Sequence, residues 1–355
     1  MNWWLQILAT ITISLLLSSP SSSHPLSQDF SSIPEPPFDP SNTWGGFSQF
    51  QDAPLGSNIT GMVELKKYFQ RFGYLLNPPN SSETLTDCFD EEFESAVRTY
   101  QARLSLSVTG RLDPDTLAQV MTPRCGMPDK GLGGPFHEVG HYAFFPGVPK
   151  WPRGKKALTY GISPTNMVNY LDMEDVRMAL SRAFDRWSNV IPLNFTETQD
   201  YYGADIKIGF FSGDHGDGQP FDGVLGILAH AFSPSNGNFH LDASETWSTD
   251  FGVQKSRVAI DLESVATHEI GHLLGLGHSK EKEAIMYPSL SPRTKKMELR
   301  SDDIIGVQSL YGSNPNFDPN LLTQSDLLSN LGGEGIRGTW SVLLVLGLGF
   351  LICCL

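Results

Sequence analysis

The sequence predicts a small all-α domain followed by an α+β domain. Apolar residues recur at helical spacing between residues 56 and 122, for example in 61–76. After residue 151 the pattern becomes mixed, and 204–211 alternates as a strand does. The length of 355 residues allows about two domains of ordinary size.

Each element is expected from its own pattern and flanking residues. In the first domain, helices are expected at 61–76, 91–106 and 114–120. In the second, strands are expected at 157–162 and 204–211, and helices at 173–190, from about Leu262, and through Tyr311 with Ser301 as the cap. A packed core is sufficient to explain the apolar stripes of the first domain, so no ligand is assigned to it.

The charge balance and both ends of the chain bear on its location. The chain has 39 acidic against 25 basic residues, a net charge of -14, which argues against a nucleic-acid partner. Residues 3–17 are mostly apolar and precede a serine-rich run, as in a secretory signal over 1–23. Residues 340–355 are apolar and follow a glycine-rich spacer, which resembles a GPI-attachment signal with Asn330 as the favoured attachment site and Ser329 or Gly332 as alternatives. A short transmembrane anchor is the alternative.

One segment, HEIGHLLGLGH, begins at His268 and has the spacing of a metal site. Positions four apart share a helix face, so His268 and His272 can bind one ion together. Gly275 lets the chain leave the helix, and the turn brings His278 back as a third ligand. Three protein ligands leave one position of zinc open for water, as in catalytic sites. Glu269 lies beside that position and can accept the water's proton while zinc lowers its pKa.

The shorter pattern H-E-x-x-H also occurs at 137–141. Glycine- and proline-rich flanks disfavour a helix there, and no third histidine follows at the right spacing. We interpret this copy as part of a linker.

Two further motifs accompany the metal segment. The sequence AIMYP around Met286 lies where metzincin proteases turn a methionine beneath the metal. Upstream, PRCGMPD around Cys125 resembles the cysteine-switch segment of the matrix metalloproteinases, or matrixins. A thiolate is a strong zinc ligand, so Cys125 in the open position would displace water and keep the protein latent. The resemblance implies that Arg124 and Asp129 hold the segment in its pose.

The matrixin resemblance implies a zincin (metzincin) fold: a twisted five-stranded sheet with three helices and a cleft under an edge strand. A small all-α prodomain of the peptidoglycan-binding-like type would precede it. The short tail after Tyr311, without a hemopexin domain, is most similar to the plant GPI-anchored branch. The implied parts are a signal peptide (1–23), an extended lead-in (24–55), a helical prodomain (56–122), a switch segment and linker (123–150), a catalytic domain (151–312), a linker (313–330) and a removed GPI signal (331–355).

The resemblance also implies a second zinc ion and one or more calcium ions. Four residues match the closed structural zinc site of the family, namely His215, Asp217, His230 and His240. A calcium site would use the carboxylates of Asp222, Asp242 and Glu245 and the backbone carbonyls of Gly223, Leu225 and Ile227. A second calcium site at Asp205 is in question, because the loop 233–239 is shorter than in the family.

For function, the resemblance implies a monomeric zinc-dependent endopeptidase that cleaves extracellular or cell-surface proteins. The edge strand at 225–229 would pair with an extended substrate, and the S1′ pocket would take an apolar residue such as Leu or Ile. Ser264 would help to set the depth of that pocket. No furin-type site lies between Cys125 and Trp151, so another protease or autolysis would remove the propeptide.

The remaining cysteines and the sequons fit a secreted chain. Cys88 is interpreted as a free or buried thiol, because pairing it with Cys125 would abolish the switch. Three Asn-x-Ser/Thr sequons, at Asn58, Asn80 and Asn194, are candidate glycosylation sites.

Two alternatives belong to other classes. The first is a surface-bound interaction protein with dormant proteolysis, which the intact Glu269 opposes. The second is a peptidase of the astacin or adamalysin type, which Cys125 and the methionine turn oppose.

Overall fold

The computed structural model describes residues 42–76, 85–130, 137–139 and 142–319. These residues all belong to one structural unit, 39–355. The predicted signal peptide, Asn80, Asn330 and the GPI signal lie outside the described residues.

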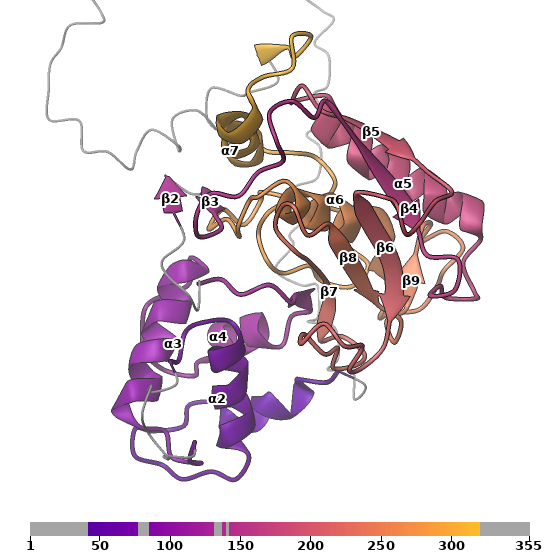
Figure 1. Ribbon diagram of the computed structural model, residues 1–355. Helices are drawn as coiled ribbons and strands as arrows, with labels where there is room; N and C mark the ends of the chain where they lie inside the picture. The colour runs from indigo at the N-terminus through magenta and orange to yellow at the C-terminus, as the bar shows by residue number, and fades with distance from the viewer. Residues whose placement is uncertain (1–41, 77–84, 131–136, 140–141, 320–355) are drawn as a thin grey trace, which may run out of the picture. The chain divides into compact units, whose positions relative to one another are not determined.

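The first domain is helical, as the sequence predicts. Asp90 and Asp113 cap two of its helices, each accepting a hydrogen bond from a backbone N–H in the first turn. Phe69, Phe93 and Tyr100 are fully buried between the helices. The elements are η2 (Gly45–Phe50), α2 (Met62–Arg71), α3 (Glu91–Arg103) and α4 (Pro114–Val120) (Figure 1).

The prediction of an extended lead-in over residues 24–55 is wrong for part of that segment. Gly45–Phe50 forms the 3-10 helix η2, and Phe47 and Phe50 are buried in the core of the helical domain. Aromatic side chains spaced three apart meet on one side of such a helix, so this segment completes the domain.

A mixed sheet forms the base of the second domain, with strand order β1-β7-β8-β6-β4-β5. Only β7 and β8 pair antiparallel, with His230 opposite His240. The five strands that follow residue 151 confirm the predicted sheet, and β1 adds a sixth from the segment before it. The strands are β1 (Arg124–Cys125), β4 (Ala157–Ile162), β5 (Asn194–Glu197), β6 (Ile206–Phe211), β7 (Ile227–Ala231) and β8 (Asn238–Asp242).

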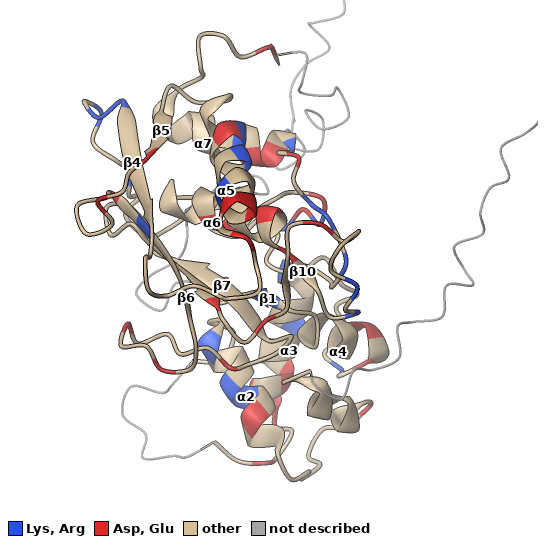
Figure 2. Cartoon of the chain, turned by 90° about the vertical axis from the view of Figure 1, so that its right-hand side faces the viewer, with Lys and Arg blue, Asp and Glu red and all other residues tan. Residues whose placement is uncertain are grey.

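Three helices accompany the sheet, as predicted: α5 (Met173–Ser188), α6 (Leu262–Leu273) and α7 (Ser301–Tyr311). Helices α5 and α6 lie side by side (Figure 1). Glu263 on α6 pairs with Arg182 and Arg186 of α5, each at 2.6 Å. Both acidic and basic residues occur along α5 and α2 (Figure 2).

Helix ends differ from the prediction where local geometry intervenes. Ser301 is the first helical residue rather than the cap, because Asp303 accepts the N–H of Arg300 in a capping box. Helix α2 ends at Arg71, and Gly73 follows with φ +83°, where a Cβ would meet Lys130 O at 2.5 Å.

The second H-E-x-x-H copy lies partly in a hairpin and not in a helix. His137–Val139 (β2) pairs antiparallel with Tyr142–Phe144 (β3). Residues 137–139 therefore form a strand and not the helix turn on which a zinc-binding H-E-x-x-H motif depends, and His141 lies outside the described residues. A further parallel pair joins β9 (Trp247–Ser248) to β10 (Ile260–Asp261).

Within the described ranges, no helix has the length and apolar character needed to cross a membrane.

Candidate active site

Helix α6 carries the first two histidines of the metal segment. Asp261 caps it by accepting the N–H of Ser264 at 2.9 Å. The helix ends before Gly275, whose φ of +103° and close approach to Pro149 O exclude a side chain. The chain then returns, and His278 reaches the face of α6 that carries His268 and His272.

The ligand atoms of the predicted catalytic set converge. His272 Nε2 lies 3.1 Å from His268 Nε2 and 3.1 Å from His278 Nε2. Cys125 Sγ lies 3.3 Å from His272 Nε2, so the thiol faces the three imidazoles. All four residues are buried, and their donor atoms lie within 4.8 Å of one another. Three imidazoles and a thiol are donors that suit zinc.

Burial sets the protonation of this group. It lowers the pKa of His268, His272 and His278, which favours the neutral imidazoles that bind metals. It also raises the pKa of Glu269 to about 8, while the adjacent Cys125 thiol acts in the opposite direction. Burial, followed by the Glu269 carboxylate, raises the pKa of Cys125 well above its usual value.

Strand β1 holds Cys125 in place by adding to the edge of the sheet. Backbone hydrogen bonds join Arg124 N to Gly226 O (3.0 Å) and Gly126 N to Ala229 O (2.8 Å). Cys125 N donates to Pro288 O at 2.9 Å. The pairing with β7 is parallel, so Arg124 and Cys125 cover the sheet edge at which the sequence analysis expects the substrate to bind.

A buried ion pair between Arg124 and Asp129 holds the same segment in position. Arg124 Nη2 lies 2.5 Å from Asp129 Oδ1, and both side chains are fully buried. The Arg124 guanidinium stacks on Phe72, with Cζ 3.6 Å from the ring centroid. Tyr74 donates its hydroxyl to Asp129 Oδ2 at 2.6 Å. The helical domain thereby fixes the turn that presents Cys125.

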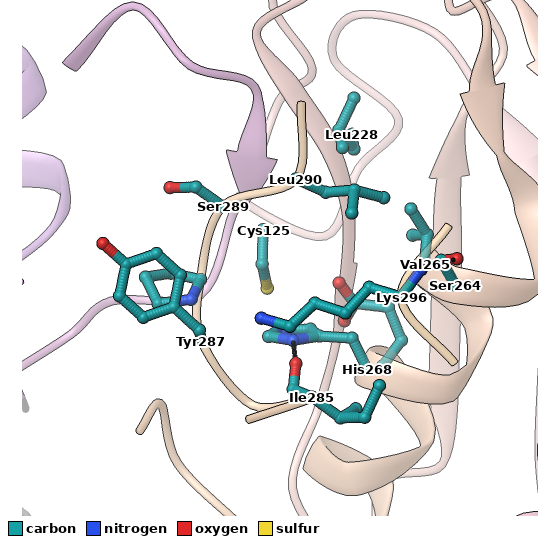
Figure 3. A pocket seen from close by; sticks show the side chains of 12 residues that line it. Cys125, Leu228, Ser264, Val265, His268, Ile285, Tyr287, Ser289, Leu290 and Lys296 are labelled. Atoms are coloured by element: carbon teal, nitrogen blue, oxygen red, sulfur yellow. Dashed lines mark hydrogen bonds between the residues drawn. The ribbon is translucent and has the colours of Figure 1, made fainter. Parts of the chain in front are cut away.

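A pocket opens beside His268 and Cys125 (Figure 3). Ser264, the residue expected to set its depth, donates to Asp261 and accepts from Lys296 N at 2.8 Å. The Lys296 side chain extends across the pocket (Figure 3), and burial lowers its pKa to about 8. Half of the lining residues are apolar, and the other half are polar or ionisable. The apolar ones are Leu228, Val265, Ile285, Tyr287, Pro288 and Leu290, and the others are Cys125, Ser264, His268, Glu269, Ser289 and Lys296.

The methionine turn lies under the metal helix. Met286 is buried, and a Cβ on Gly271 would lie 2.2 Å from its sulfur. Asp303 on α7 accepts the N–H groups of Ile285 (2.8 Å) and Met286 (3.0 Å) and so holds the turn in position.

Gly271→Ala is expected to destabilise the fold by about 1–3 kcal/mol, because overpacking at the Met286 contact outweighs the helix propensity gained. Chemical denaturation measures this loss. Gly154→Ala is the matched control, since no atom lies within 4 Å of its added Cβ. Equal stability of the two variants would contradict the steric argument.

The second predicted zinc set also converges. Asp217 Oδ2 lies 2.9 Å from His215 Nε2, 2.7 Å from His230 Nε2 and 2.8 Å from His240 Nδ1. The antiparallel register of β7 and β8 brings two of these histidines together. Burial lowers the pKa of His230 to about 4, which keeps this imidazole neutral. Four donors with this chemistry fit a closed zinc site.

The acidic residues predicted to bind calcium are close to one another but do not converge as the histidine sets do. Their carboxylates accept backbone N–H groups: Asp222 from Ile227 (2.7 Å), Glu245 from Leu225 (2.7 Å) and Asp242 from Gly223 (3.3 Å). Within the described part of the chain, Glu245 Oε2 is buried without a hydrogen-bond partner. Burial and the neighbouring Asp242 raise the pKa of Glu245 to about 9.

Other predicted residues are placed as follows. Asp205 pairs with Lys155 and accepts Thr159 N at 2.9 Å, so its carboxylate is engaged by a cation of the chain. Asn58 and Asn194 are exposed, and Cys88 is a free thiol.

Three residues that the sequence argument missed contribute to the site: Asp303, Lys296 and Tyr74. Each contacts a partner at least eighteen positions away or lines a pocket built from distant segments. Asp303 follows the helix start at Ser301 and is an acidic residue of the first turn. That position signals a cap, but nothing local indicates that its carboxylate also binds the methionine turn.

Comparison with known proteins decides the family. The matrixin family model matches residues 150–312, and a putative peptidoglycan binding domain model matches 60–120. This chain belongs to the matrixin family. It is a zinc metalloendopeptidase, with the α+β fold of that family behind an all-helical domain.

Its similarity to plant relatives extends over most of the chain. Metalloendoproteinase 1-MMP of Arabidopsis thaliana is 53% identical over 289 residues, covering 80% of this matrixin and 78% of the relative. Metalloendoproteinase 4-MMP of the same species is 51% identical over 312 residues, covering 87% and 89%. Metalloendoproteinase 1 of Glycine max is 47% identical over 266 residues, covering 73% and 85%.

Proposed function

We propose that this matrixin is made as a latent zymogen and that Cys125 acts as its switch. The observation that carries the proposal is the position of Cys125 Sγ, 3.3 Å from His272 Nε2 and within the set of three histidines. A strong fourth ligand in that position excludes water from the site. Release of β1 would therefore open both the ligand position and the edge of β7.

His268, His272 and His278 would hold the catalytic zinc, with Cys125 as the fourth ligand of the latent form. When bound, zinc supplies Lewis-acid chemistry: it lowers the pKa of a water molecule and polarises a carbonyl group. Glu269 follows His268 on α6 and would take the proton of the attacking water. It would then deliver that proton to the leaving amine.

The edge of β7 would orient the substrate. Gly226 O and Ala229 O accept N–H groups of the switch segment in the latent form, and both become available to an extended peptide once β1 leaves. The pocket beside His268 would take the side chain after the scissile bond. Its apolar side chains favour Leu or Ile at that position, and Lys296 disfavours a basic residue there.

Two further metal sites would stabilise the catalytic domain. His215, Asp217, His230 and His240 would bind a structural zinc ion, because their four donor atoms lie within 4.8 Å of one another. Calcium would bind at Asp222, Asp242 and Glu245 together with the carbonyls of Gly223, Leu225 and Ile227. The argument for calcium is the buried, unpartnered Oε2 of Glu245 beside two other acids.

Removal of calcium is expected to lower the Tm by about 5–10 °C, since a ligand at 100 times its Kd stabilises a fold by about 2.7 kcal/mol. Glu245→Gln should remove this response and leave the calcium-free stability nearly unchanged, because Gln resembles the protonated acid. Thermal unfolding with calcium and with a chelator measures both effects. Glu298→Gln, at an exposed site, is the control. A full calcium response in Glu245→Gln would exclude this site.

The processing signals support a secreted enzyme attached to the cell surface, where it would act as a monomer. The signal over 1–23 would direct secretion, and Asn330 would receive a GPI anchor, which places the membrane among its partners. Asn58 and Asn194 are exposed and would accept glycans with Asn80. The substrates would be extracellular or cell-surface proteins.

Cleavage of quenched fluorescent peptides tests the proposal. The latent chain should be inactive, and a thiol-modifying agent should activate it toward Pro-Leu-Gly-Leu. Replacing the residue after the scissile bond by Lys should reduce kcat/KM by at least about tenfold, since it places a second cation beside Lys296 in the pocket. Failure of a folded, zinc-loaded and thiol-modified chain to cut any such peptide would reject the proposed substrate class.

A further inference from the structure

Each of the three candidate ligand histidines turns Nε2 toward the other two and makes a hydrogen bond through Nδ1. His268 Nδ1 pairs with Ile285 O at 2.7 Å, and His272 Nδ1 pairs with Leu276 O at 2.8 Å. His278 Nδ1 instead pairs with Asp129 Oδ1 at 2.6 Å. Two ligands are thus oriented by carbonyls of the catalytic domain, and the third by a carboxylate of the switch segment.

The Asp129 carboxylate is itself fixed. Arg124 reaches the same oxygen at 2.5 Å, and the Tyr74 hydroxyl donates to the other oxygen at 2.6 Å. The backbone N–H of Asp129 donates to Phe72 O at 3.1 Å. These partners all precede residue 130, so the whole support belongs to the part of the chain before the catalytic domain.

A second contact from the prodomain reaches the same ligand. Arg103, at the end of α3, donates from Nη2 to His278 O at 2.6 Å. Ser105 Oγ donates to Lys280 O at 3.1 Å. Both the ring and the backbone of His278 are therefore contacted by the propeptide.

A histidine that binds a metal through Nε2 carries its proton on Nδ1, and a carboxylate at Nδ1 fixes that tautomer and makes the ring a stronger donor. We infer that Asp129 is a positioning residue for the zinc ligand His278. The inference rests on the proposed catalytic zinc site. The switch segment then contributes twice to the latent centre: Cys125 as a ligand, and Asp129 through the third histidine. Removal of the propeptide leaves His278 without its carboxylate, so zinc is held less tightly after activation for a reason separate from loss of the thiolate.

The test separates Asp129 from the thiolate by measuring zinc release. All proteins carry Glu269→Gln to prevent autolysis and Cys125→Ser to remove the thiolate. Zinc transfer to a chromophoric chelator is followed for this parent, for Asp129→Ala and for the isosteric Asp129→Asn. A further His268→Ala variant identifies which release phase belongs to the catalytic set. Tyr74→Phe is the matched control, because it removes a hydrogen bond from Asp129 but leaves the contact with His278.

Asp129→Ala is expected to release the catalytic zinc about tenfold faster or more, with Asp129→Asn between it and the parent. Tyr74→Phe should stay within about twofold of the parent on the same scale. The absorption spectrum of the cobalt-loaded parent should shift in Asp129→Ala and not in Tyr74→Phe, and circular dichroism confirms folding.

Equal release by Asp129→Ala and the parent, or an equal acceleration by Tyr74→Phe, would overturn the inference. If the parent lacks the zinc pool that His268→Ala removes, the proposed catalytic site fails, and the inference fails with it.

Discussion

Glu269→Gln is expected to lower the kcat/KM of the activated enzyme by about 10²–10⁴-fold, the range found for loss of a general base. The amide keeps the shape of the side chain but cannot accept the proton of the attacking water. Glu269 follows His268 on α6 and is fully buried in the unprocessed chain. Zinc content should not change, because the three histidines remain. Peptide cleavage and metal analysis on the same preparation measure both quantities.

A second glutamate on the same helix provides the control. Glu263 is also buried, but it pairs with Arg182 and Arg186 on α5 and lines no part of the pocket. Glu263→Gln should therefore lower the free energy of unfolding while kcat/KM stays within about twofold of wild type. Retention of activity in Glu269→Gln would assign the proton transfer to another group.

The metal helix could be predicted because its geometry is local. Residues four apart share a helix face, and a glycine after the second histidine permits the return that brings His278 back. The structure brings the three imidazoles together, as this local geometry predicts. By contrast, His215, His230 and His240 lie on a loop and two strands, and only strand register places them together. No local spacing encodes that register, so this set came from the family resemblance.

Features that depend on contacts between distant segments could not be predicted from the sequence. Strand β1 is two residues long and pairs with a strand about a hundred positions later, so periodicity could not reveal a sixth strand. The sequence predicts Ser301 as the cap of α7, because serine is a common capping residue. In the structure Arg300 is the cap, and Asp303 supplies the side-chain contact. The same carboxylate also binds the methionine turn, a role that follows from the packing of α7 and from no motif.

Cys125→Ser is expected to make the unprocessed chain active without any activating treatment. A hydroxyl is a far weaker zinc ligand than a thiolate, so water can enter the fourth position. If the latent state loses about 3 kcal/mol of stabilisation relative to the open state, activity rises by ~10²-fold. Activity should stay below that of the processed enzyme, because β1, Arg124 and Asp129 still pack against the site.

Cys88→Ser separates the switch from a general effect of thiol loss. Cys88 is the other described free cysteine. Its backbone forms an isolated β-bridge with Asn58 in the helical domain, and its thiol does not belong to the histidine cluster. Cys88→Ser should remain latent and should still be activated by a thiol-modifying agent, whereas Cys125→Ser should be active before the agent is added and insensitive to it. Latency that survives in Cys125→Ser would mean that the covering of β7 by β1 inhibits the enzyme by itself. The switch would then be the strand, with the thiol as a supporting contact.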